Sequence, residues 1–186
     1  MTDRITVWTK QHERMLQELE ETGRYTAKSR YVRLDLGELA PLVIFAYEWL
    51  AANTPNQENR PEDAQTPIWI SLTQDSRMSL TPGTVLLELS IDPEIVTPIN
   101  IGKWGAILNY SYIPKDPVDA KAHNELLAQQ GINDAKAVMT PFYPVIKRQV
   151  TQSWKRLFDE SVSLGVDSYY GNIWEVRREW ITQIYR

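Results

Sequence analysis

The sequence predicts a single compact α+β domain, residues 1–186, with a small mixed or antiparallel sheet and several packed helices. Apolar residues recur at helical spacing in some segments, whereas short β-branched and aromatic runs bounded by turn residues occupy others. The 186 residues are one domain's length of chain. At this length folding buries roughly 70% of the surface that an unfolded chain exposes, so a core needs no metal or disulfide.

The first third of the chain predicts a strand followed by two helices. Ile5 to Trp8 is rich in strand-forming residues, and Gln11 to Thr22 repeats apolar residues at helical spacing before Gly23, which typically ends a helix. Asp35 with Glu38 resembles a capping box. The apolar face of the helix expected after it consists of Leu42, Phe45, Ala46, Trp49 and Leu50.

The middle of the chain predicts a polar surface loop and two strands. The apolar pattern stops from residue 53 to residue 67, where three prolines stand among Asn, Gln and Glu. Ile68 to Leu72 and Val85 to Ile91 are short β-rich runs, which we expect to be joined across the turn at Pro82 and Gly83. The second run is the more apolar, and we expect it to be central.

The last part predicts three helices and a pair of terminal strands. Asn100 to Asn109 has an apolar helical face, Asp116-Pro117 opens a helix that Gly131 closes, and Pro144 opens one that runs to Phe158. The last of these carries an apolar stripe, made of Ile146, Val150, Trp154 and Leu157. The aromatic and β-branched runs 169–176 and 180–185 predict two terminal strands or, alternatively, one long bent strand.

Composition excludes several classes of function. The chain has no Cys, which rules out disulfides, zinc–thiolate and iron–sulfur sites and cysteine nucleophiles. His12 and His123, taken as exposed helical histidines, give no metal-site spacing, so no metal is predicted. No phosphate-binding glycine loop and no nucleophile elbow occurs. Without a signal-peptide core or a long apolar run, we expect a cytoplasmic protein with no membrane partner.

The residues 24–33 form the one strongly basic stretch, in which Arg24, Tyr25 and Arg30 combine charge with aromatic rings. Such a combination is typical of sites that engage phosphates and stack bases. The net charge of -4 and the pI near 5.3 argue against broad nucleic-acid binding. A solvated strand or loop is the alternative interpretation.

The seven tryptophans are the second feature that composition singles out. We expect Trp49, Trp104 and Trp154 on apolar helical faces to belong to the core. Trp8, Trp69 and Trp174 fall in predicted strands, where one or two could line a pocket for a planar ligand.

Glu175 is the best catalytic candidate, because it is a carboxylate within an apolar strand. Strand alternation places it opposite Trp174 and Val176, so it faces solvent if those two residues point into the core. Glu88, inside the run from Val85 to Ile91, has the same ambiguity.

Short aromatic motifs from Trp8 to the C-terminus together resemble an uncharacterised, mainly bacterial family, domain of unknown function 3841. The motifs are Trp8-Thr9 with Gln11, Ala46-Tyr47-Glu48-Trp49, Pro67-Ile68-Trp69, Trp104 with Leu108-Asn109, Ser153-Trp154 with Phe158, and Trp174-Glu175. The resemblance implies a compact intracellular domain and supplies no activity.

A second, partial resemblance is to compact ADP-ribosyltransferase-type folds. It rests on the first strand, a helix ending in Gly23-Arg24-Tyr25, and the later strand Val85 to Pro93. The resemblance implies NAD in a cleft, with Glu175 orienting the reacting ribose and with Thr9 and Ser71 near the nucleotide. Where such folds often carry His or Arg on the first strand, this chain has Thr9.

Three functions therefore stay open from the sequence. The favoured one is a binding or regulatory module with an aromatic-lined pocket for a nucleotide, a nucleic-acid end or a peptide. Its candidate ligand-binding residues are Trp8, Thr9, Gln11, Arg24, Tyr25, Arg30, Trp69 and Ser71. The alternatives are an NAD-dependent transferase that uses Glu175 and a structural subunit that binds a protein partner or a second copy of the chain. NAD is a cofactor only under the first alternative.

Overall fold

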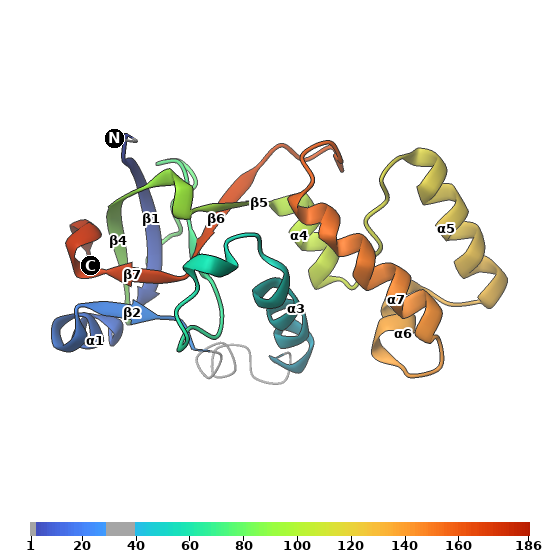
Figure 1. Ribbon diagram of the computed structural model, residues 1–186, viewed down its shortest axis with the longest axis horizontal. Helices are drawn as coiled ribbons and strands as arrows, with labels where there is room; N and C mark the ends of the chain where they lie inside the picture. The colour runs from blue at the N-terminus through green and yellow to red at the C-terminus, as the bar shows by residue number, and fades with distance from the viewer. Residues whose placement is uncertain (1–2, 29–39) are drawn as a thin grey trace. The chain divides into compact units, whose positions relative to one another are not determined.

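The structure, a computed structural model, describes residues 3–28 and 40–186 and confirms the α+β class (Figure 1). The chain divides into two compact units. The first unit comprises Met1–Pro98 and Tyr169–Arg186, and the second comprises Ile99–Ser168. The expectation of one domain spanning residues 1–186 stays a prediction.

The first unit contains a three-stranded antiparallel sheet in the order β1-β4-β8. Its strands are β1 (Ile5–His12), β4 (Thr84–Ile91) and β8 (Ile181–Tyr185). The central position of β4 confirms the prediction from its apolar run, and Figure 1 shows β1 and β4 side by side. Gly83 has φ 77°, a left-handed conformation that favours glycine, in the turn immediately before β4.

The remaining strands form two further sheets. One pairs β2 (Arg24–Thr26) with β7 (Glu175–Arg177) antiparallel, and the other has the order β3-β6-β5. Its members are β3 (Ile68–Ile70), β6 (Tyr169–Ile173) and β5 (Thr97–Asn100). The expectation that the runs 68–72 and 85–91 form neighbouring strands across the Pro82–Gly83 turn is wrong, because β3 pairs with β6 whereas β4 pairs with β1 and β8.

The core of the first unit follows from strand alternation. Val7 on β1 is fully buried, as are Leu87, Leu89 and Ile91 on β4, and α1 (Met15–Thr22) adds Met15 and Leu19. Burying each such side chain contributes about 1.5–3 kcal/mol relative to leaving it in water.

Helix α1 ends where the sequence predicts, but it begins later in the chain than predicted. Gly23, at φ 79°, donates its amide to the carbonyl of Leu19 and closes the helix. The residues from Gln11 to Arg14 were expected to be helical, but β1 extends to His12 because the strand pairs with β4 over its whole length. The predicted helix with the apolar face is α3 (Ala40–Asn53). Its expected capping box at Asp35 and Glu38 lies outside the described residues.

The segment from residue 53 to residue 67 is irregular apart from one 3₁₀ turn, Gln57–Asn59. It is not fully solvated, because Thr54, Ala64 and Thr66 are buried. Asn56 accepts a hydrogen bond from Trp174 Nε1 at 2.8 Å. Part of this polar loop therefore covers an indole ring.

The second unit is helical, with α4 (Ile101–Leu108), α5 (Pro117–Gln130), α6 (Asp134–Met139) and α7 (Pro144–Ser153) (Figure 1). A 3₁₀ turn at Trp154–Phe158 continues α7. Asn100 and Asp116 cap their helices by accepting the amides of Lys103 at 3.1 Å and Asp119 at 2.8 Å.

Two elements of the second unit bear directly on the sequence analysis. The stripe on α7 and its continuation is buried as predicted, at Ile146, Val150, Trp154 and Leu157. The short helix α6 was not predicted; Asn133 caps it by accepting the amide of Lys136. In the described ranges, none of the helices has the length and apolar character required to cross a membrane.

Candidate functional site

Five of the candidate ligand-binding residues meet where β1 runs beside β3. Trp8 and Ser71 exchange two backbone hydrogen bonds, at 3.0 and 2.7 Å. The Thr9 hydroxyl donates to the carbonyl of Trp69 at 2.8 Å and accepts from Gln11 Nε2 at 2.9 Å. Thr9 and Ser71 are buried, so their polar groups here join two strands.

The indole of Trp8 belongs to a second cluster, which we call the Glu88 cluster. One oxygen of Glu88, Oε2, accepts from Trp8 Nε1 at 3.1 Å and from the Tyr185 hydroxyl at 2.9 Å. Its other oxygen accepts from the Thr182 hydroxyl at 2.9 Å. The hydrogen bonds from Thr182, Tyr185 and Trp8, with the charge of Arg77, hold the pKa of Glu88 below its usual value.

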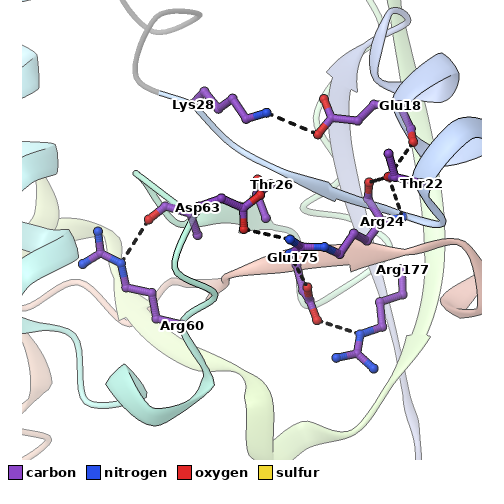
Figure 2. A network of polar contacts seen from close by, with 10 residues as sticks. Glu18, Thr22, Arg24, Thr26, Lys28, Arg60, Asp63, Glu175 and Arg177 are labelled. Atoms are coloured by element: carbon purple, nitrogen blue, oxygen red, sulfur yellow. Dashed lines mark hydrogen bonds and ion pairs between the residues drawn. The ribbon is translucent and has the colours of Figure 1, made fainter.

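Glu175 lies in a network of charged side chains on β2 and β7 (Figure 2). Its Oε1 is 2.6 Å from Arg177 Nε, and its Oε2 is 3.4 Å from Arg24 Nη1. Arg24 also contacts Asp63 at 2.9 Å, and Asp63 accepts from the Thr26 hydroxyl at 3.2 Å. The Glu175 carboxylate is thus held between two guanidinium groups.

These contacts decide how Glu175 is placed. The residue is 9% exposed although its neighbours Trp174 and Val176 are buried, so it neither extends into solvent nor points into the apolar core. Burial alone would raise the pKa of Asp63, but the hydrogen bond and charge of Arg24 and the hydrogen bond of Thr26 outweigh it and lower that pKa. No comparison tests the use of Glu175 with NAD, which stays a prediction.

The remaining residues of the basic stretch 24–33 have separate environments. Tyr25 is buried in the apolar core of the first unit, opposite Val176. Lys28 lies 3.5 Å from Glu18 (Figure 2). Arg30 lies outside the described residues. In the described part of this stretch, the side chains therefore either pack in the core of the first unit or form ion pairs within it.

The tryptophans are largely used in packing. Trp8, Trp104, Trp154 and Trp174 are buried, whereas Trp49, Trp69 and Trp180 are half-buried. Core positions are thus confirmed for Trp104 and Trp154, and Trp49 is less buried than predicted. Arg60 covers the ring of Trp174 at 4.9 Å from its centroid.

A cavity of about 340 Å³ lies in the second unit, and none of the residues singled out for binding from the sequence lines it. Helix α5, helix α7, the 3₁₀ turn that follows α7 and the segment before α5 supply its walls. The lining residues are Tyr112, Asp119, Ala122, His123, Leu126, Gln149, Gln152, Ser153 and Arg156.

The expectation that His12 and His123 are exposed helical histidines holds only in part for each residue. His12 is exposed, but it ends strand β1 and is not helical. His123 lies on helix α5 as expected, but it is not exposed. His123 is only 7% exposed and stacks on Tyr112, with ring centroids 3.9 Å apart and 12° between the planes. Its Nε2 is 2.6 Å from Asp134 Oδ1, and the other oxygen of Asp134 accepts the Tyr112 amide at 2.8 Å. Helix α6, absent from the prediction, supplies this carboxylate.

A second carboxylate fixes the other side of Tyr112. The Tyr112 hydroxyl donates to Asp119 at 3.0 and 3.1 Å, and Arg156 Nη1 is 3.1 Å from the same carboxylate. Burial opposes ionisation of Asp119, but the hydrogen bonds from the Lys115 amide and from Tyr112, with the charge of Arg156, lower its pKa. The guanidinium of Arg156 also lies 5.3 Å from the centroid of Tyr112.

The sequence carries one signal for this arrangement. Asp116-Pro117 opens α5, so positions 119, 123 and 126 recur on one face of the helix at spacings of four and three residues. The partners on α6 and α7 carry no recognisable motif. Throughout residues 3–28 and 40–186, no three His, Asp or Glu side chains are grouped as ligands for a metal ion.

Comparison with known proteins gives one match. No curated protein and no solved structure matches this chain. A family model described as a domain of unknown function (DUF3841) matches residues 6–182 of the 186-residue chain. The match spans both compact units and agrees with the resemblance carried by the aromatic motifs. The chain belongs to this family, the domain of unknown function 3841.

Proposed function

We propose that this protein is a binding module and that its ligand site is the cavity of the second unit. The observation that carries the proposal is a cavity of about 340 Å³ lined mainly by polar and aromatic side chains. Sites for small molecules occupy roughly 300–1,000 Å³, so this volume suits a ligand at the small end of that range.

The two opposite charges that line the cavity are already matched, because Arg156 pairs with Asp119. The ring of His123 is held by a hydrogen bond to Asp134. A ligand of high charge would have to separate Arg156 from Asp119 or remain unmatched, and an unmatched partly buried charge is costly. The internal pairing therefore favours an uncharged ligand, and it holds Tyr112 and His123 in fixed orientations before any ligand arrives.

The groups left for a ligand are hydrogen-bonding and neutral. When His123 is uncharged and donates Nε2–H to Asp134, its Nδ1 is a hydrogen-bond acceptor. Gln149 and Gln152 line the cavity, and among the described residues neither amide forms a side-chain hydrogen bond. An amide presents one acceptor and two donors, the pattern that pairs with the edge of a nucleobase. We therefore assign the ligand to the class of nucleobases and nucleosides.

The test is a ligand panel read by thermal unfolding. Free bases and nucleosides are compared with the corresponding nucleotides, and a ligand at about 100 times its dissociation constant should add about 2.7 kcal/mol of stability. The uncharged members should stabilise the chain more than the nucleotides. Gln149→Ala and Gln152→Ala should each weaken binding, whereas Gln130→Ala, an exposed glutamine at the end of α5 outside the cavity lining, should not.

Two results would refute the proposal. One is the absence of any shift with bases or nucleosides at about 5 mM, which means a dissociation constant above about 1 mM and hence binding weaker than about -4 kcal/mol. The other is equal affinity in Gln149→Ala, Gln152→Ala and Gln130→Ala, because the ligand would then bind elsewhere.

A further inference from the structure

A cation lies close to two aromatic rings of the β1-β4-β8 sheet. The guanidinium carbon of Arg77 lies 5.7 Å from the centroid of the Trp8 ring and 6.0 Å from that of Tyr185. Both distances are within the range of about 6 Å over which a ring quadrupole attracts a cation. The two rings come from strands far apart in the sequence, β1 and β8, which flank β4.

Glu88 on the central strand fixes both rings. Its single oxygen Oε2 accepts from the indole of Trp8 and from the hydroxyl of Tyr185. Thr182 holds the other oxygen. Because three donors favour the ionised form, the carboxylate keeps its negative charge beside the cation. Two oriented rings and one fixed carboxylate are the parts that recognition of a cationic side chain uses.

Arg77 lies in a segment that forms neither a helix nor a strand. The preceding residue, Ser76, is anchored, since its carbonyl accepts from the Ser71 hydroxyl at 2.9 Å and from the Tyr170 hydroxyl at 3.0 Å. Arg77 itself is half-buried, and its Nε donates to the carbonyl of Gln74 at 2.9 Å. Rotation of the Arg77 side chain away from the rings would break this hydrogen bond to Gln74 and leave the anchor at Ser76 in place.

We propose that Trp8, Tyr185 and Glu88 form a binding site for the guanidinium group of an arginine side chain on a partner peptide, and that Arg77 occupies it in the free protein. Arg77 supplies the evidence that a guanidinium fits between the rings. Arg77 also competes with the partner. The apparent affinity for the partner therefore equals the intrinsic affinity multiplied by the fraction of molecules in which the site is vacant. This site lies in the first unit and is independent of the cavity in the second.

The experiment titrates N-acetyl-arginine amide into the full chain, with tryptophan fluorescence and calorimetry as readouts. Arg77→Ala should bind this probe at least about 10-fold more tightly than the wild type, because the competing side chain is gone. The double variant Arg77→Ala, Glu88→Gln should lose that gain. N-acetyl-citrulline amide, which has nearly the same shape without the charge, should not bind. Arg178→Ala, an exposed arginine on a 3₁₀ turn, should behave as the wild type.

Each outcome of this experiment either supports or overturns the proposal. Equal affinity in the wild type and Arg77→Ala, equal binding of the citrulline probe, or no binding to Arg77→Ala at about 10 mM probe would each overturn the proposal. Arg77→Met is measured alongside as a second vacated variant that keeps an apolar stem against the rings. Its agreement with Arg77→Ala supports the site, and a tighter binding seen in only one of them contradicts it.

Discussion

Replacing Glu88 with Gln tests how much the carboxylate of this residue stabilises the β1-β4-β8 sheet. Glu88 accepts hydrogen bonds from Trp8, Thr182 and Tyr185. Hydrogen bonds to a charged group contribute about 1.5–3 kcal/mol each when buried, but glutamine keeps one acceptor oxygen and water reaches this half-buried site. We therefore expect Glu88→Gln to lower the free energy of unfolding by about 1–2 kcal/mol near neutral pH.

The pH dependence of this loss has a definite sign. The pKa of Glu88 in the folded chain lies below the value of 4.5 that an unperturbed glutamate has. A group with a lowered folded pKa stabilises the fold fully above the unfolded pKa and loses that contribution as the pH falls through the folded pKa. The difference between wild type and Glu88→Gln should thus be constant above about pH 6 and shrink below about pH 4.5.

The assay is urea unfolding followed by far-ultraviolet circular dichroism at about pH 7, about pH 5 and about pH 3.5. Comparing two variants at each pH cancels the titration of other carboxylates. Glu62→Gln, at an exposed position in the first unit, serves as the matched control and should change stability by less than about 0.5 kcal/mol. A Glu88→Gln loss that is the same at every pH, or that Glu62→Gln reproduces, would refute the reasoning.

Three further substitutions have directions set by the packing. Gly171→Ala should destabilise the chain by about 1–3 kcal/mol in urea unfolding, because the new Cβ would lie 2.8 Å from Ile70 Cγ1. Gly105→Ala, in helix α4 with nothing within 4 Å of the new Cβ, should instead stabilise by up to about 1 kcal/mol, and equal effects at the two glycines would contradict this. Trp154→Phe removes the donor that reaches the carbonyl of Ser111 at 2.9 Å. Trp154→Phe should lower the free energy of unfolding by about 1–3 kcal/mol, measured by thermal unfolding. An unchanged melting transition would contradict this and show that water takes the place of the indole donor.

The helices were predictable where local chemistry determines them. Asp116 caps α5, Pro117 fits its first turn and Gly131 takes the left-handed conformation at its end, all within a few neighbouring residues. The stripe from Ile146 to Leu157 was equally clear, because helical spacing alone brings those side chains to one face. Helix α6 was missed since a six-residue segment is too short to show a period.

Strand pairing and the polar clusters were not predictable, because they depend on residues distant in the sequence. Nothing near Ile68 indicates that β3 pairs with β6, which is closer to the C-terminus. Alternation along the predicted strand 169–176 describes Trp174 and Val176, but it cannot show that Arg24 reaches across to Glu175. The candidate site in the second unit was missed for the same reason, since Asp134 on an unpredicted helix buries His123.

The ends of the second unit touch each other: the amide of Ile101 donates to the carbonyl of Ser168 at 2.9 Å. Strands β5 and β6, which enter and leave this unit, are neighbours in one sheet. A gene encoding this protein could therefore lose the codons for residues 101–168, which begin after β5 and end before β6, and close the gap with a short turn. The excised stretch could be expressed as a cassette or its ends ligated into a ring. Such an architecture lets recombination exchange the cavity-bearing insert without changing the two strands that flank it in the sequence.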